Sequence, residues 1–230
     1  MIKHIPIIRY QDIAKTAKDK ETTTLDLLEY QLKYLHNKGF ETLTLEHLSE
    51  SLDEYTPRKI VLTFDGGYLG HYQYVFPLLQ RYNYTGVFFI PTNHIGVLSS
   101  WGYSKKSLLS FEDIFEMYQW GMEIGVNSAS HCDLTTLTAE ELAEEIIDSK
   151  KCLEKMLTSE VKYFSYPYGK YNNKVKDCVQ QAGYTNAVSI FDKQKDLSNS
   201  RFAIDRLQTT NKKNIFSYLD IRRVASGTWK

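Results

Sequence analysis

The sequence has few cysteines, no excess of charge and no long hydrophobic run. Cys132, Cys152 and Cys178 are odd in number and lack Cys-x-x-Cys spacing, so they predict no disulfide framework. The 28 basic and 28 acidic residues cancel, which gives no reason to expect nucleic acid or an anionic membrane as a partner. No apolar run approaches the roughly 20 residues of a membrane span.

The N-terminal residues, Met-Ile-Lys-His-Ile-Pro, contain no apolar signal-peptide core. We therefore expect a cytoplasmic protein if the sequence is read as written, and an extracytoplasmic one if a leader has been trimmed. No pattern in the sequence specifies an oligomeric state.

The composition and the order of apolar segments predict one α/β domain over residues 1–230. Hydrophobic content of 42% and charged content of 24% are typical of a globular domain with a sizeable core. Predicted strands alternate with helices whose starts resemble capping boxes, at Ser110 with Asp113 and at Thr138 with Glu141. Such alternation predicts βα units around a parallel sheet, and about seven units favour a barrel. The short apolar runs expected as strands are 5–8, 42–45, 61–64, 87–90, 124–126, 163–166, 184–190 and 203–204.

Four polar segments directly follow predicted strands. Each has an ordinary explanation by itself: Asp-Gly-Gly is a common tight turn, a lone loop histidine is usually solvated, and Tyr-Pro-Tyr-Gly is typical of a turn. Because the carboxyl ends of parallel strands meet at one edge, the segments together predict a functional site. They are Asp65-Gly66-Gly67, residues 127–131, residues 166–169 and Asp205-Arg206.

These segments resemble the motifs of the polysaccharide deacetylase family, also called the NodB-homology or carbohydrate esterase 4 family. Residues 63–67, Thr-Phe-Asp-Gly-Gly, are similar to its Thr-Phe-Asp-Asp-Gly signature. Residues 127–131 stand where the family has His-Ser/Thr-x-x-His. Residues 164–169, Phe-Ser-Tyr-Pro-Tyr-Gly, resemble the form found in the exopolysaccharide branch, which acts on poly-N-acetylglucosamine. The resemblance implies a distorted (β/α)7-type barrel.

The resemblance also implies a chemistry, the hydrolysis of the acetamide of N-acetylhexosamine units with the help of a divalent metal, usually zinc. In this sequence Asp65 matches the general base, and the backbone of Tyr168 matches the group that binds the oxyanion. His131 matches one of three metal ligands. Tyr166, Arg206 and Trp101 are expected to bind substrate, the last from a long loop at about residues 91–109.

The family's metal ligands are not all present in this sequence. Gly66 stands where the family has its ligand aspartate, and Asn127 stands where it has the first ligand histidine. Only His131 remains, so we expect no metal or a weakly bound one. Cys132 is a poor replacement, because neighbours on an extended chain point to opposite faces.

Two functions therefore stay open. One is an N-deacetylase in which Asp65 is the base. No histidine follows His131 in the sequence, so Asp205 is the speculative proton donor. The other is an inactive homologue that binds saccharide without hydrolysing it. On the sequence alone, Gly66→Asp combined with Asn127→His is expected to restore zinc binding.

Overall fold

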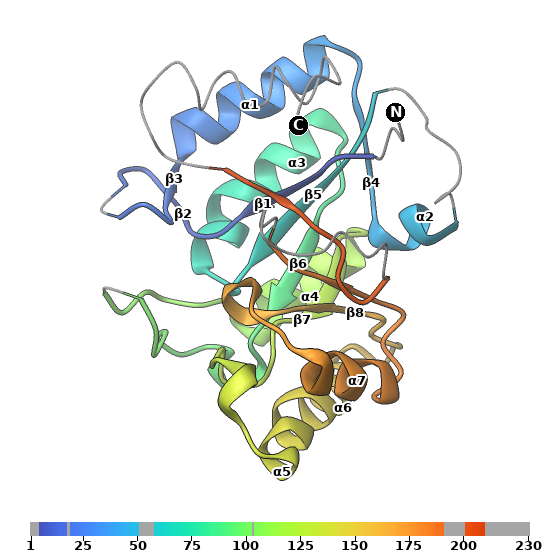
Figure 1. Cartoon of the computed structure of the whole chain (residues 1–230). Helices are drawn as coiled ribbons and strands as arrows, with labels where there is room; N and C mark the ends of the chain where they lie inside the picture. The colour runs from blue at the N-terminus through green and yellow to red at the C-terminus, as the bar shows by residue number, and fades with distance from the viewer. Residues whose placement is uncertain (1–4, 18, 51–57, 103, 191–200, 210–230) are drawn as a thin grey trace.

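The computed structural model describes residues 5–17, 19–50, 58–102, 104–190 and 201–209. It contains an eight-stranded sheet whose paired strands run parallel, and a small pair formed by β2 and β3 (Figure 1). The strands are β1 (Ile7–Tyr10), β2 (Ile13–Ala14), β3 (Thr23–Thr24), β4 (Glu41–Leu43), β5 (Lys59–Asp65), β6 (Val87–Ile90), β7 (Glu123–Val126), β8 (Tyr163–Ser165), β9 (Asn186–Val188) and β10 (Leu207–Gln208).

The large sheet has the order β10-β1-β5-β6-β7-β8-β9, with β4 paired to the first residues of β5. Strand β5 is central, because β1 lies along one side of it and β6 along the other. Near the end of the described chain, Ile204 bridges to Val188 in β9, and β10 pairs with β1. Residues 204–208 therefore link the two ends of the curved sheet, as expected for the predicted barrel.

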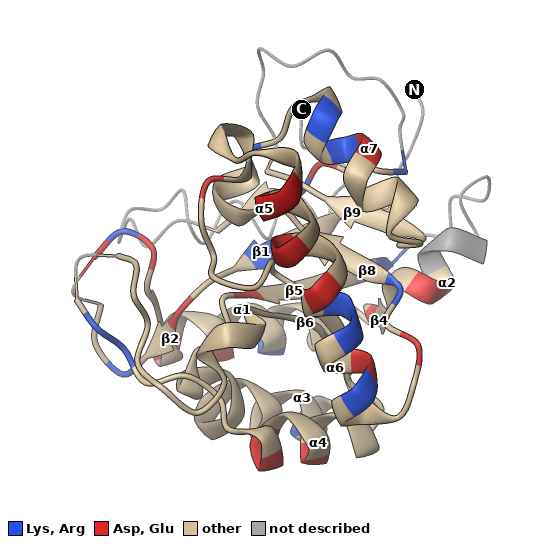
Figure 2. Cartoon of the chain, turned by 90° about the horizontal axis from the view of Figure 1, so that it is seen from below, with Lys and Arg blue, Asp and Glu red and all other residues tan. Residues whose placement is uncertain are grey.

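Seven α-helices lie within the described residues, and capping residues fix several of their starts. Both predicted capping boxes are confirmed, at Ser110 with Asp113 and at Thr138 with Glu141. Figure 2 shows charges of both signs on the outer surfaces of the later helices. The helices are α1 (Leu25–Asn37), α2 (Leu45–Glu50), α3 (Phe76–Tyr82), α4 (Phe111–Gln119), α5 (Ala139–Ala143), α6 (Ser149–Leu157) and α7 (Asn173–Gln181). π-Helical turns precede α3 (His71–Val75) and join α5 to α6 (Glu144–Asp148).

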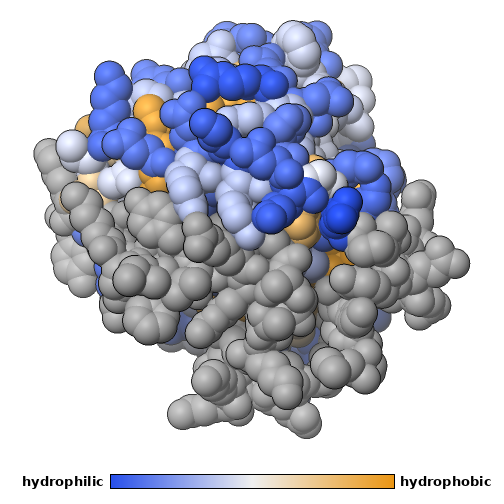
Figure 3. Space-filling view, turned by 90° about the horizontal axis from the view of Figure 1, so that it is seen from above, coloured by the Kyte–Doolittle hydropathy of each residue, from blue (hydrophilic) through white to orange (hydrophobic). Residues whose placement is uncertain are grey.

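The described surface seen from above is mainly hydrophilic (Figure 3). Within the described residues, no helix is both long enough and apolar enough to cross a membrane.

The alternation of side chains along β5 separates two hydrophobic clusters. Leu62 and Phe64 belong to the large cluster between the sheet and the helices. Val61 belongs to a smaller cluster on the other face. Because side chains two residues apart share a face, Thr63 and Asp65 also point to the side of the smaller cluster. The same alternation in β1 places Arg9 on the face that carries Ile7. The fold therefore directs Arg9 and Asp65 toward each other across adjacent strands.

Candidate functional site

Asp65 is the last residue of β5, and the chain turns away immediately after it. Gly66 and Gly67 both have positive φ, at 92° and 60°, which glycine adopts without steric strain. The Gly66 N–H donates to the Phe89 carbonyl of the neighbouring strand at 3.1 Å, which holds the turn in place. Asp65 is only 1% exposed, so its carboxylate must be neutralised within the protein.

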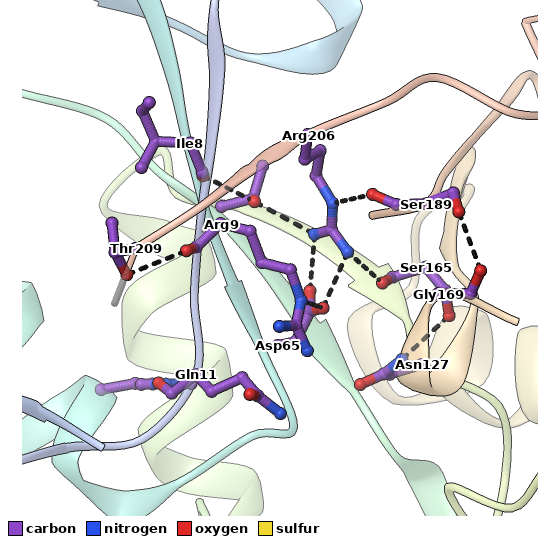
Figure 4. Close-up of polar contacts among 12 residues, drawn as sticks. Ile8, Arg9, Gln11, Asp65, Asn127, Ser165, Gly169, Ser189, Arg206 and Thr209 are labelled. Carbon is purple, nitrogen blue, oxygen red and sulfur yellow. Dashed lines mark hydrogen bonds and ion pairs between the residues drawn. The ribbon is translucent and has the colours of Figure 1, made fainter. Parts of the chain in front are cut away.

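Two arginines hold both oxygens of the Asp65 carboxylate (Figure 4). Arg206 donates from Nη1 to Oδ1 at 2.7 Å and from Nη2 to Oδ2 at 2.8 Å. Arg9 donates from Nε to Oδ2 at 2.6 Å. Burial would raise the pKa of Asp65, but the charges and hydrogen bonds of Arg206 and Arg9 outweigh it and hold that pKa well below its usual range. A carboxylate in this state is a weak base.

Arg206 is completely buried, and every donor of its guanidinium group has a protein partner. Besides Asp65, it donates to the Ser189 carbonyl at 2.9 Å, to Thr63 Oγ1 at 3.0 Å and to Ser165 Oγ at 2.9 Å. The predicted role in substrate binding therefore does not match its placement. Arg206 fixes the orientation and charge of Asp65 instead.

His131 lies in an aromatic environment and is only 2% exposed. Its ring stacks on Trp101, with centroids 4.3 Å apart, and meets the edge of Tyr168 at 4.9 Å. Burial lowers the pKa of His131 to about 4, although the charge of Asp65 opposes this shift. The imidazole is therefore neutral near pH 7, and its Nδ1 has no hydrogen-bond partner among the described residues.

Trp101 and Tyr168 are the predicted site residues with side chains near the surface. Trp101 donates from Nε1 to the Tyr68 hydroxyl at 2.9 Å, which fixes the indole over His131. Tyr168 is 42% exposed, and its backbone has a positive φ of 58°. The structure thus brings Trp101, His131 and Tyr168 together, and the exposed parts of the Trp101 and Tyr168 rings can contact a ligand.

Tyr166 lies in the core rather than at the surface of the site. It is 1% exposed, its hydroxyl donates to the Phe202 carbonyl at 2.9 Å, and its ring stacks on Tyr171 at 4.9 Å. The expected contact with substrate would require this packing to break. Asp205, the speculative proton donor, lies near enough to Tyr171 for its charge to add to burial in raising that phenol's pKa.

The first metal-ligand position, Gly66, has no room for a side chain. A Cβ atom built there would lie 2.7 Å from Cε2 of Tyr68, and the φ of 92° is unfavourable for any other residue. This clash opposes the zinc binding expected from Gly66→Asp combined with Asn127→His. The Tyr68 ring occupies the space next to Gly66.

At the second ligand position, Asn127 is tied to the neighbouring strand. Its Nδ2 donates to the Ser165 carbonyl at 2.9 Å, and its Oδ1 is buried without a partner among the described residues. Cys132, the proposed replacement ligand, packs against the large core cluster.

The residues present do not fit a catalytic zinc site. Within the described part of the chain, no three His, Cys, Asp or Glu side chains are grouped so that they could hold a metal. His131 and the amide oxygen of Asn127 are two donors, whereas such sites use three protein ligands, of which imidazole and carboxylate are typical. Asp65 is already neutralised by arginines, and the positive charge of Arg9 opposes a second cation nearby.

Three residues around the site were missed at the sequence level: Arg9, Gln11 and Tyr68. For Arg9 a signal was available, since an arginine interrupts the otherwise apolar and aromatic strand Ile7–Tyr10. A buried arginine usually has a carboxylate partner, and Asp65 was the obvious candidate. No comparable signal pointed to Tyr68, because its role depends on the turn geometry at Gly66.

Comparison with known proteins gives consistent results. The protein YxkH of Bacillus subtilis (strain 168), which carries a polysaccharide deacetylase name, is 29% identical over 209 residues, covering 90% of this chain and 71% of YxkH. The poly-β-1,6-N-acetyl-D-glucosamine N-deacetylase of Staphylococcus aureus (strain N315) is 22% identical over 192 residues, covering 78% of this chain and 64% of that protein. This chain therefore spans only part of the length of these relatives.

The fold is shared with solved deacetylases. The structure of the Streptococcus pyogenes deacetylase PplD in complex with acetate matches with a TM-score of 0.81 at 22% identity, covering 94% of this chain and 97% of that one. This likeness confirms the predicted barrel-type fold. The family model "Polysaccharide deacetylase" matches residues 53–187, which is more than half of the sequence. The chain belongs to the polysaccharide deacetylase family.

Proposed function

We propose that this chain binds N-acetylated saccharide at the carboxyl edge of its sheet and does not hydrolyse it by the metal-dependent route. The observation that carries the proposal is the state of Asp65, whose two oxygens already accept hydrogen bonds from Arg9 and Arg206. A general base must have a free oxygen within reach of the attacking water and a pKa near the working pH. The arginines hold the pKa of Asp65 well below that range and occupy three of the about four lone-pair sites of its carboxylate.

The donor set supports the same proposal. Gly66 offers no side chain, and Asn127 offers an amide oxygen in place of imidazole. With His131 as the one remaining family ligand, little is available to polarise an acetamide carbonyl or to lower the pKa of a bound water. Loss of catalysis leaves the binding surface intact, because saccharide recognition depends on aromatic faces and hydrogen-bond donors.

Trp101 and Tyr168 provide that surface in this proposal. Their rings flank His131 and can stack on the apolar face of a hexose. The name of the Staphylococcus aureus relative suggests the ligand to test, a β-1,6-linked oligomer of N-acetylglucosamine.

Calorimetric titration with such oligomers, together with an assay for acetate release in added zinc, tests the proposal. We expect binding without release of acetate. Trp101→Ala should weaken binding about tenfold, which corresponds to roughly 1.4 kcal/mol. Trp120→Ala is the matched control, since Trp120 is 62% exposed at the end of α4. Zinc-dependent release of acetate by the unaltered protein would instead establish the N-deacetylase.

A further inference from the structure

Arg9 is a buried cation whose outer nitrogens point into the site. Arg9 is 2% exposed, and of its three guanidinium nitrogens only Nε contacts Asp65. Nη1 and Nη2 make no hydrogen bond or ion pair with another described residue. Figure 4 shows both atoms directed away from the strand, toward the side where Gln11 and Asn127 lie. The Gln11 amide follows Arg9 by two residues and extends into the same region.

The charges around Asp65 do not cancel. One carboxylate faces two guanidinium groups, so the cluster of Arg9, Asp65 and Arg206 carries one excess positive charge. Because all the donors of Arg206 have protein partners, the unsatisfied donors belong to Arg9.

The nearest carboxylate along β1 does not neutralise Arg9. Asp12 pairs with Lys106 at 2.9 Å and accepts a hydrogen bond from Thr22 at 3.1 Å, and it forms no ion pair with Arg9 in the described chain. Arg9 shares its one counterion, Asp65, with Arg206, and an anionic ligand would balance the positive charge that remains.

Arg9 also faces the same space as Asn127, which stands at one of the family's metal-ligand positions (Figure 4). A protein cation therefore stands in a site that lacks the donors for a metal cation. Its free fork, Nη1 with Nη2, has the geometry that binds a carboxylate through two parallel hydrogen bonds.

We propose that Arg9 makes this an anion site, which binds the carboxylate of an acidic saccharide. Gln11 supplies a further donor, and Trp101 and Tyr168 contact the sugar ring. The inference rests on the proposed saccharide-binding function and specifies the class of saccharide, one that carries a uronate next to an N-acetylated unit.

The first test uses the unaltered protein. Calorimetry compares a tetrasaccharide of alternating glucuronate and N-acetylglucosamine with the same tetrasaccharide as its neutral methyl ester. We expect the acid to bind at least tenfold more tightly, and equal affinities would overturn the inference. Inorganic phosphate is the competitor that separates a carboxylate site from a general oxyanion site. Displacement by phosphate at concentrations equal to those of the acid would refute carboxylate selectivity.

Variants of Arg9 provide the second test. Arg9→Lys keeps the charge but removes the fork, and Arg9→Met removes both, so the acid should bind about tenfold more weakly to the first and more weakly still to the second. Arg81→Met is the matched control, because Arg81 is an exposed arginine paired with Glu29 on the surface. If Arg9→Met does not fold, Arg9→Lys and the methyl ester decide the matter.

The two proposals fail in different ways. If the neutral N-acetylglucosamine oligomer binds and the acid has no advantage, the carboxylate site is refuted and the proposed function stands. If neither saccharide binds, the proposed function is refuted and the inference with it.

Discussion

The substitution Asp65→Asn removes the one carboxylate that neutralises two buried arginines. In the native protein the side chains of Asp65, Arg9 and Arg206 are at most 3% exposed, so water screens their charges poorly. Asparagine has nearly the same shape, but its NH2 group faces arginine N–H donors where a carboxylate oxygen accepted from them. The substitution therefore removes the charge and part of the hydrogen bonding, and it leaves Arg9 and Arg206 as neighbouring cations without a counterion.

Removing one partner of a buried ion pair destabilises a protein by about 3–5 kcal/mol, because the other partner stays buried and unpaired. We expect Asp65→Asn to lower the free energy of unfolding by at least that much, since two cations lose their partner. For a chain of this size, the loss corresponds to a fall in Tm of roughly 6–20 °C.

Urea denaturation followed by circular dichroism measures the loss. Asp148→Asn is the control, because Asp148 is 62% exposed and pairs with Lys151 on the surface, where such a change costs no more than about 0.5 kcal/mol. A loss below about 1 kcal/mol for Asp65→Asn would refute the reasoning. Adding Arg9→Met to Asp65→Asn should recover part of the loss, because it removes one of the two unpaired cations.

The same ion pairs make stability depend on pH. The pKa of Asp65 is lower in the folded protein than in the unfolded chain, where it is about 3.9. The stabilisation is therefore complete well above pH 4 and is lost as the pH falls toward the folded-state pKa. The difference in stability between the native protein and Asp65→Asn should be constant near neutral pH and shrink below about pH 4.

Three further predictions concern the rest of the site. The pKa of His131 is about 4 in the folded protein, against about 6.5 in an unfolded chain. The contribution of His131 to the free energy of unfolding should therefore be complete above pH 6.5 and fall by about 3 kcal/mol by pH 4. Urea denaturation across that pH range should show a weaker dependence of stability on pH for His131→Gln than for the native protein. The double variant Gly66→Asp with Asn127→His should not bind zinc stoichiometrically by calorimetry, because Tyr68 blocks the new aspartate, and tight binding would contradict the steric argument. Tyr166→Phe should lose about 1 kcal/mol of stability in urea and keep saccharide affinity, since its hydroxyl bonds only within the core, and a large fall in affinity would contradict that placement.

Features set by neighbouring residues were predictable from the sequence. The apolar run 87–90 is a strand with the expected bounds, and the capping boxes at Ser110 and Thr138 start helices. Segment 42–45 is different, because its strand ends at Leu43 and Leu45 begins α2. The carboxylate of Glu123 accepts hydrogen bonds from the first N–H groups of that helix, a tertiary contact that no local pattern reveals.

The site was predictable only in part, for the same reason. The motifs predicted that Asp65 and His131 lie at one edge of the sheet, and in the structure they lie at or after the ends of the parallel strands β5 and β7. The motifs gave no information about Arg9, which is separated from Asp65 by 56 positions and reaches it only because β1 pairs with β5 in one register. Arg206 was expected to bind substrate, but its buried guanidinium group forms an ion pair with Asp65 and has no donor left for a substrate.

The residues at and around the family's metal-ligand positions all disfavour a metal cation. Replacing the ligand aspartate by Gly66 removes a negative charge, and the Tyr68 ring fills the space. Replacing a histidine by Asn127 exchanges a strong metal ligand for a side chain bonded to β8. Arg9 places a positive charge beside Asp65. Each of these features disfavours a metal cation, and the proposed anion site would use the last of them, so we expect that restoring one ligand alone does not restore metal binding.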